Sequence, residues 1–303
     1  MIALITRKMN RLTMEDYIIN TTCTILAAIV LLATLYPFYY CLINSFNIGT
    51  DAQKGGIYFF PRQFTLDNYK IVFEYNTLAQ TFMMTVLRTI LGTATGIFFT
   101  AMVAYGLSQK HLLFRKTYSI LGIITMYFSG GLIPYYLLLN KIGLINNFLV
   151  YIIPALYSVF NALLFMAFFR DIPESLKESA RLDGANDFYI FLKVILPVSK
   201  PVLATLALFV GVGHWNDWFA PAFFMTNEKM ITLPVLLIRM VADTETQQKL
   251  NDAVTLSGGQ MRSVTLEAVR FATMIIAVFP ITLVYPFIQK YFVQGMMVGA
   301  IKA

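Results

Sequence analysis

The sequence predicts an all-α integral membrane protein with six transmembrane helices. Its 303 residues are 58% hydrophobic and only 13% charged, whereas soluble domains contain about 25% charged residues. Several stretches reach the roughly 20 apolar residues that a helix needs to cross a bilayer core. We therefore expect one bundle of helices over residues 21–303, preceded by an N-terminal segment, residues 1–20.

The apolar stretches are separated by polar loops, which sets the number of spans. The first stretch is too long for the core of a signal peptide, about 7–15 residues, so we expect it to remain in the membrane. Only two spans carry a charge, Arg88 in the second and Asp217 in the fifth. The six predicted spans are residues 21–45, 78–107, 117–139, 144–169, 202–225 and 271–288.

The distribution of basic residues predicts the orientation. With both termini inside, the inner segments hold 13 Lys and Arg residues and the outer segments hold 9. Because inner loops carry an excess of these residues, we expect a multi-pass protein of the cell (inner) membrane with cytoplasmic termini. Loops 46–77 and 226–270 then lie outside, and loop 170–200 lies in the cytoplasm. We attribute the net charge of +7 to basic residues in the loops, which determine the membrane topology. The sequence has no basic patch typical of nucleic-acid binding.

The cytoplasmic loop 170–200 reads as helix, turn, helix. Pro173 suits the first turn of a helix, and Gly184 suits the position just after a helix end. A second helix is expected over 188–195, ending at Pro197. Spacings of three and four residues among Glu174, Lys177, Glu178 and Arg181 favour ion pairs. The residues alone leave two interpretations open: a hairpin that docks into a groove of another protein, or a helix lying on the lipid surface.

The spacing of this loop also resembles a known family. Glu178-Ser179-Ala180, three residues, Gly184, nine residues and Val194-Ile195-Leu196-Pro197 resemble the EAA loop of ABC-importer permeases. In that loop Glu-Ala-Ala, three residues, Gly and nine residues precede Ile, any residue and Leu-Pro. Ser179 replaces an Ala, and Val194 replaces the Ile. The segments GGLIPYYLLLNKIGLINN, WNDWFAPAFF and YPFIQKYFVQGMMVGAIKA extend the likeness over nearly the whole chain, to the carbohydrate-uptake branch and importers of alginate-type oligosaccharides.

The resemblance implies a type I permease fold, with the coupling hairpin between spans four and five. It implies half of an oligosaccharide pathway that works by alternating access, with acidic alginate- or pectin-type chains among the candidate substrates. The implied partners are a sister permease, two ATPase subunits, an extracytoplasmic solute-binding protein and membrane lipid, but no nucleic acid. ATP and Mg²⁺ would be bound by the ATPases, so this chain is expected to hold no cofactor and to catalyse no reaction. The residues implied in ATPase coupling are Glu178, Ser179, Ala180, Asp183, Gly184, Leu196 and Pro197.

Residues 256–260 spell LSGGQ, the signature of ABC ATPases, and we interpret this match as a coincidence. The chain has no G-x-x-x-x-G-K-[ST] phosphate loop. The surrounding outer loop, about 45 residues, is also shorter than a domain of roughly 50 residues or more. A weaker alternative is an anion site at the start of a following helix.

A charge inside a span is costly and marks a candidate functional residue. Arg88 would either meet the substrate in a wet cavity or extend to the membrane surface. Asp217 would either bind sugar hydroxyls or pair with Arg88. Aromatic rings stack on sugars but are also common at membrane interfaces. The candidate pathway residues are Arg88, Tyr135, Tyr136, Asn140, Trp215, Asn216, Asp217 and Trp218.

The sequence gives little support for a metal site or a catalytic site. The two histidines, His111 and His214, lack Cys or acidic partners at the spacing of a metal site, and no catalytic triad or carboxylate pair is evident. Two rival functions remain open: a secondary transporter, disfavoured because no internal repeat is visible, and an integral membrane enzyme. Association with an ATPase would separate both rivals from the importer subunit.

Overall fold

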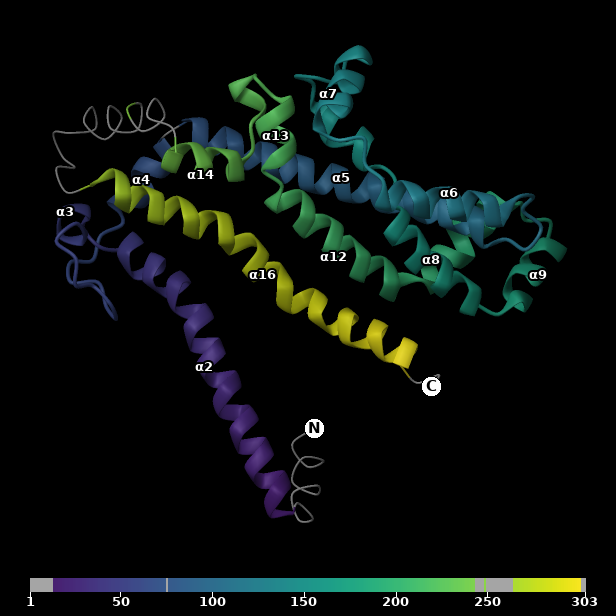
Figure 1. The fold of residues 1–303 in the computed structure, drawn as a ribbon, viewed down its shortest axis with the longest axis horizontal. Coiled ribbons are helices and arrows are strands. Elements are labelled where there is room, and N and C mark those ends of the chain that lie inside the picture. The colour runs from purple at the N-terminus through teal and green to yellow at the C-terminus, as the bar shows by residue number, and fades with distance from the viewer. Residues whose placement is uncertain (1–12, 75, 243–247, 249–263, 301–303) are drawn as a thin grey trace. The chain divides into compact units, whose positions relative to one another are not determined.

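A computed structural model describes residues 13–74, 76–242, 248 and 264–300 (Figure 1). Within these ranges the chain is helical apart from loops and one isolated antiparallel bridge between Asn47 and Phe64, which confirms the all-α class. Three helices are long and apolar enough to cross a membrane, or six spans if each of three bent pairs counts as one. The chain divides into two compact units, residues 1–72 with 248–275, and residues 73–247 with 276–303.

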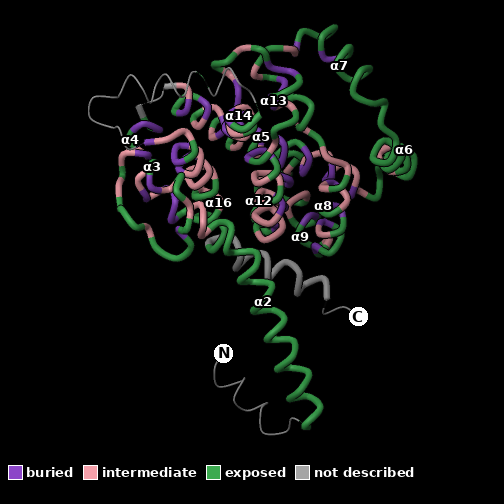
Figure 2. The backbone as a smooth tube through the Cα atoms, turned by 60° about the vertical axis from the view of Figure 1, so that its left-hand side comes forward, coloured by how far each residue is buried: buried purple, intermediate pink, exposed green. Residues whose placement is uncertain are grey.

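The first unit contains the long helix α2 (Met14–Ser45) and the short helices α3 (Gly49–Ala52) and α4 (Asp67–Glu74, which runs into the second unit). A capping box starts α2: the amide of Asp16 donates to Oγ1 of Thr13, and the amide of Thr13 donates to the Asp16 carboxylate. This cap starts the helix before residue 21, the predicted start. The residues of α2 from Met14 to Phe38 are exposed (Figure 2), as those of an apolar helix surrounded by lipid would be.

The second unit is built around α5 (Asn76–Ser108), which packs against α8 (Val159–Asp171) and α12 (Lys200–Asn216). Small residues and rings fill the space between these helices. Tyr105 of α5 lies edge-on to Phe169 of α8, with ring centroids 6.4 Å apart, and stacks on Phe191 at 5.5 Å. Both phenylalanines are fully buried. The three rings therefore belong to the hydrophobic core in which residue 191 packs against α5 and α8.

The remaining helices of the described chain are short, except the last. They are α6 (Arg115–Tyr127), α7 (Leu132–Lys141), the 3₁₀ turns η1 (Phe148–Tyr151) and η2 (Ile153–Ala155), α9 (Glu174–Leu182), α10 (Asp187–Ile190), the π-helical turn η3 (Phe191–Ile195), α11 (Leu196–Val198), α13 (Phe219–Phe224), the 3₁₀ turn η4 (Glu228–Met230), α14 (Leu233–Ala242) and α16 (Leu266–Ala300). The chain passes from the first unit to the second after residue 275, within α16.

The third and fourth predicted spans are not the straight helices that hydropathy predicts. The chain bends by 116° between α6 and α7, and by 46° between the 3₁₀ turns and α8. Gly131, at φ +86°, precedes α7, a backbone conformation that a residue with a Cβ adopts only with strain. Pro154 lies in η2 and Ser158 caps α8. Hydropathy counts apolar residues and carries no information on these breaks.

Candidate functional site

The loop between α9 and α10 forms the turn that the sequence predicts. The amide of Ala185 donates to the carbonyl of Ala180, and the amide of Gly184 donates to that of Arg181, both at 3.0 Å. These two bonds define a Schellman motif, in which the residue after the cap adopts a left-handed conformation. Gly184 has a φ of +81°, so the prediction that it terminates the helix is confirmed. Asn186 then caps α10 by accepting from the amide of Tyr189 at 2.8 Å.

Ion pairs fix the two arms of this hairpin, residues 174–198. Glu174 lies 3.3 Å from Lys177, which confirms the predicted pair at a spacing of three residues. Glu174 also lies 3.8 Å from Arg181, seven residues further along α9, a pair that the predicted spacings do not include. Arg181 also reaches across the turn to Asp187, with 3.2 Å between Nη2 and Oδ1. This hydrogen bond raises the pKa of the Arg181 guanidinium. The turn is therefore held by backbone and side-chain bonds together.

The second arm differs from the prediction that a helix over 188–195 ends at Pro197. The chain runs from α10 through the π-helical turn η3 into α11, and ends at Val198. Proline has no amide to donate and is tolerated in the first turn of a helix, where Pro197 lies in α11. The direction changes by 85° between this arm and α12, so the bend falls between Pro197 and Pro201, not before Pro197.

The residues implied in coupling form one surface at the turn, apart from Leu196 and Pro197 at the far end of the second arm. Glu178, Ser179, Asp183 and Gly184 are exposed, while Ala180 and Leu196 are half-buried and Pro197 is exposed. Leu182, beside them, is 89% exposed. A hollow of about 570 Å³ lies against the turn. Its lining includes Asp183, Gly184, Asn186, Tyr189 and Lys193.

The two charges inside the predicted spans bind each other. Arg88 of α5 is 3% exposed, and its guanidinium forms an ion pair with the Asp217 carboxylate. The same guanidinium donates to the Asp217 carbonyl at 3.1 Å and lies 4.4 Å from the centroid of the Tyr151 ring. The pairing alternative from the sequence is thus the observed one. A buried cation needs such a partner, because an isolated buried charge is strongly unfavourable.

Asp217 also explains why the fifth span breaks. Its Oδ1 accepts from the amides of Phe219 at 2.8 Å and Ala220 at 3.3 Å, which are the first free amides of α13. One carboxylate therefore ends α12, starts α13 and neutralises Arg88. The sequence predicts one continuous span over residues 202–225. That prediction is wrong, because the Asp217 carboxylate caps a new helix within it.

The neighbours of Asp217 face different environments. Trp215 is buried and donates its indole N–H to the carbonyl of Ala277 at 3.0 Å. Asn216 and Trp218 are exposed. On α7, Asn140 is exposed, and the ring centroids of Tyr135 and Tyr136 lie 5.6 and 6.2 Å from that of Phe224. The structure thus brings Arg88 and Asp217 into contact, but does not gather all the candidates at one point.

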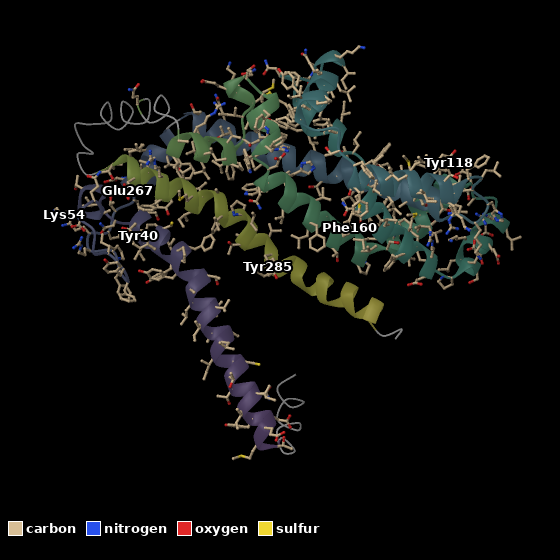
Figure 3. All side chains as sticks on the ribbon, in the orientation of Figure 1. Tyr40, Lys54, Tyr118, Phe160, Glu267 and Tyr285 are labelled. Carbon is tan, nitrogen blue, oxygen red and sulfur yellow. The ribbon has the colours of Figure 1, made fainter. Side chains whose placement is uncertain are left out.

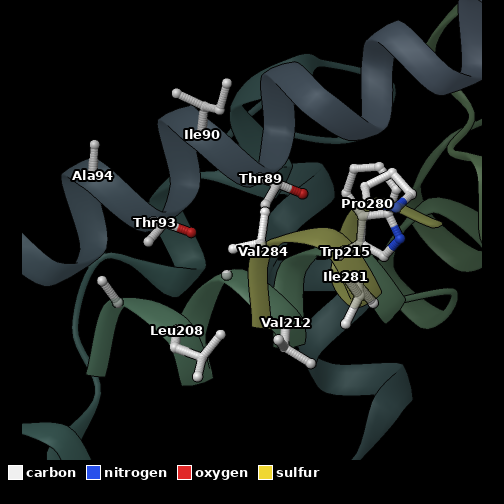
Figure 4. A pocket seen from close by; sticks show the side chains of 12 residues that line it. Thr89, Ile90, Thr93, Ala94, Leu208, Val212, Trp215, Pro280, Ile281 and Val284 are labelled. Carbon is white, nitrogen blue, oxygen red and sulfur yellow. The ribbon is translucent and has the colours of Figure 1, made fainter. Parts of the chain in front are cut away.

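A cavity of about 390 Å³ lies beside Trp215, between α5, α12 and α16 (Figure 4). Apolar side chains dominate its wall, with Ala207, Leu208, Val212, Pro280, Ile281 and Val284 among them. The hydroxyls of Thr89 and Thr93 also lie there and have no hydrogen-bond partner among the described residues. Sequence reasoning missed both threonines, because hydroxyl residues are common within helices and carry no charge to mark them.

Sequence reasoning also missed the contact between Gly92 of α5 and His214 of α12. A Cβ added to Gly92 would lie 2.6 Å from Nε2 of His214, so only glycine fits there. A partial signal was present, because Gly92 and Gly96 are four residues apart, the small-residue spacing that lets membrane helices approach closely, but Gly96 faces the carbonyl of Ala155 and not α12.

Some predictions fall outside what the structure describes. The LSGGQ sequence at 256–260 and most of the 243–263 segment are not among the described residues. Within the described residues, no group of three or more His, Cys, Asp or Glu side chains is arranged to hold a metal ion. His111 is exposed, and His214 is buried against α5.

Comparison with known proteins gives consistent matches. The family model described as "Binding-protein-dependent transport system inner membrane component" matches residues 71–298. Protein LplC of Bacillus subtilis (strain 168) is 35% identical over 271 residues, covering 89% of this chain and 90% of LplC. The polygalacturonan/rhamnogalacturonan transport system permease protein YtcP of the same organism is 33% identical over 271 residues, covering 89% of this chain and 93% of YtcP.

A solved structure is also similar. A chain from the crystal structure of a bacterial ABC transporter involved in the import of the acidic polysaccharide alginate superposes with a TM-score of 0.86 at 29% identity, covering 93% of this chain and 99% of that chain. These matches confirm the resemblance to ABC-importer permeases and the type I fold, and the chain is a translocation subunit, not an enzyme. It belongs to the family of inner membrane components of binding-protein-dependent transport systems.

Proposed function

We propose that this chain is a permease subunit of an ATP-driven oligosaccharide importer. It would form half of the translocation pathway with a sister permease, and two separate ATPase subunits would drive it. An extracytoplasmic solute-binding protein would deliver the substrate to loops 46–77 and 226–270. ATP and Mg²⁺ would be held by the ATPases. The termini and the hairpin would lie in the cytoplasm, as the distribution of Lys and Arg supports.

The observation that carries the coupling role is the form of the hairpin. A rigid turn around Gly184 exposes Leu182 and Asp183, and ion pairs fix both arms. The second arm continues through the buried residues Phe191 and Ile195 into the core beside α5 and α8. A force applied at the turn would therefore move the helices of this unit. Small residues and an exposed apolar side chain suit docking into a groove of another protein.

For the substrate, we propose an oligosaccharide of the acidic, alginate or pectin type. The similarity to YtcP and to the alginate transporter supports this choice. In this chain, Arg88 is neutralised by Asp217, so we propose that it orders the pathway wall and does not bind a substrate carboxylate. ATPase activity of the reconstituted importer should rise with oligoalginate or oligogalacturonide and not with a neutral oligosaccharide. Equal stimulation by the neutral sugar would refute the acidic assignment.

Gly184 offers the sharpest test of coupling. Gly184→Asp should abolish transport and weaken ATPase association without preventing membrane insertion. Gly184→Asn is the matched control, because Asn adopts the left-handed conformation more readily than other residues, and no atom lies within 4 Å of an added Cβ. If the Asn variant also loses the ATPase, the partner needs the space at Gly184. If the Asp variant imports normally, the docking role is wrong.

Co-purification tests the proposal against its rivals. The importer subunit should be recovered with an ATPase after mild solubilisation. A secondary transporter would work without one, so uptake by the purified chain alone in vesicles would contradict the proposal.

A further inference from the structure

A loop of the first unit, residues 55–62, presents three aromatic side chains outward. Tyr58, Phe59 and Phe60 are 56%, 68% and 78% exposed, whereas the neighbouring Ile57 is 2% exposed. We call residues 58–60 the aromatic tip. Three consecutive large aromatic side chains facing water would be less favourable than the same side chains in an apolar environment, so the structure must be explained by what surrounds them.

The loop that carries the aromatic tip is a fixed structure. Nη2 of Arg62 donates to the carbonyl of Gly55 at 2.7 Å and to that of Asp51 at 3.2 Å, which closes the base of the loop. Nε of Arg62 donates to the Asp51 carboxylate at 3.1 Å. Beyond the base, the amide of Ile48 donates to the carbonyl of Gln63 at 2.9 Å, and the amide of Thr65 to that of Phe46 at 2.8 Å. These hydrogen bonds therefore fix the loop in a conformation that directs the aromatic tip outward.

The position of the aromatic tip along α2 gives its depth. The hydroxyl of Tyr39 donates to the carbonyl of Phe59, so the tip lies level with Tyr39. This residue precedes Ser45, the end of α2, by about 9 Å at 1.5 Å per residue. The loop thus folds back along the membrane helix from which it emerges, as seen beside α2 in Figure 1 and near Tyr40 in Figure 3.

Tyrosines mark this level of α2 as the edge of the bilayer. Tyr36, Tyr39 and Tyr40 lie within five residues, and tyrosine is concentrated where a span meets the headgroups. About 20 residues of hydrocarbon core counted from the predicted start at residue 21 also end at Tyr40. The aromatic tip is therefore continuous with the lipid-facing surface of α2.

We infer that the aromatic tip inserts into the bilayer interface and binds membrane lipid on the side where α2 leaves the membrane. It would hold the first unit at a fixed depth while other parts of the permease move. The occupant is the acyl and headgroup boundary of the bilayer, and the rival occupant is the surface of the sister permease. This inference does not depend on the substrate or on ATPase coupling.

Site-directed spin labelling tests the inference in the complete importer in lipid bilayers. With Cys23 and Cys41 replaced by alanine, Phe59→Cys and, as a second tip position, Tyr58→Cys would each carry the label. Lys54→Cys, exposed in the same unit, is the matched control. We expect the ratio of collisions with oxygen to collisions with a water-soluble nickel complex to be several-fold higher at the tip positions than at residue 54.

Two results would overturn the inference. Equal nickel access at residues 58, 59 and 54 would place the tip in water, and low access of both reagents at the tip positions would show that protein covers it. Transport activity of each labelled variant verifies that the complex is folded and assembled.

Discussion

Gly92 of α5 faces His214 of α12 so closely that an added Cβ would lie 2.6 Å from Nε2 of the imidazole. Both residues are buried, so neither helix has free space at this point. The contact lies one helical turn from the ion pair of Arg88 with Asp217, and together they fix the separation of α5 and α12.

Gly92→Ala should therefore destabilise the permease by about 1–3 kcal/mol, the usual cost of overpacking. Gly106→Ala on the same helix is the control, because no atom lies within 4 Å of its added Cβ and alanine favours helix by about 0.5–1 kcal/mol. Thermal unfolding in detergent would measure both. In a His214→Ala background the further loss caused by Gly92→Ala should be much smaller, and an undiminished loss there would show that the imidazole is not the obstacle.

The ion pair between Arg88 and Asp217 predicts which of the two side chains costs more stability when it is removed. Asp217→Asn leaves the Arg88 cation, which is 3% exposed, without its counter-charge, at a cost of about 3 kcal/mol. Arg88→Leu leaves the Asp217 carboxylate, which is 29% exposed and can gain water, so it should cost less. The double variant should be more stable than Asp217→Asn alone. Additive losses in thermal unfolding would argue against a coupled pair.

The loop of the first unit should loosen in acid. The hydrogen bond from Asn47, together with the Arg62 guanidinium, holds the pKa of the Asp51 carboxyl below its ordinary value. A carboxyl with a lowered folded-state pKa stabilises the fold above its unfolded pKa of about 3.9, and that stability is lost as the pH falls through the folded pKa. A spin label at residue 59 should become more mobile below about pH 4. Asp51→Asn should remove this pH dependence, and an unchanged transition in that variant would exclude Asp51 as its source.

Much of the fold could be predicted because composition and helix-ending residues act locally. The length of apolar stretches predicts α2, α5 and α16, and the glycine after Asp183 predicts the hairpin turn. The bends at Gly131 and Asp217 were not predicted, since each depends on a hydrogen bond or backbone angle that hydropathy does not contain.

The site was predictable only as individual residues. Arg88 and Asp217 stand out because charges are rare in spans, but their pairing joins residues 129 positions apart and needs the packing of α5 on α12. The roles of Tyr151 and His214 depend on the same packing, and nothing in their local sequence separates them from other aromatic residues.

The most direct test of the central claim is the accessibility of the hairpin turn. A variant with Asp183→Cys, in a background without Cys23 and Cys41, would be treated with a membrane-impermeant maleimide. We predict labelling in inside-out vesicles stripped of ATPase, protection when the ATPase subunits are bound, and no labelling of intact, right-side-out vesicles. Labelling of residue 183 from the outer face would contradict the account.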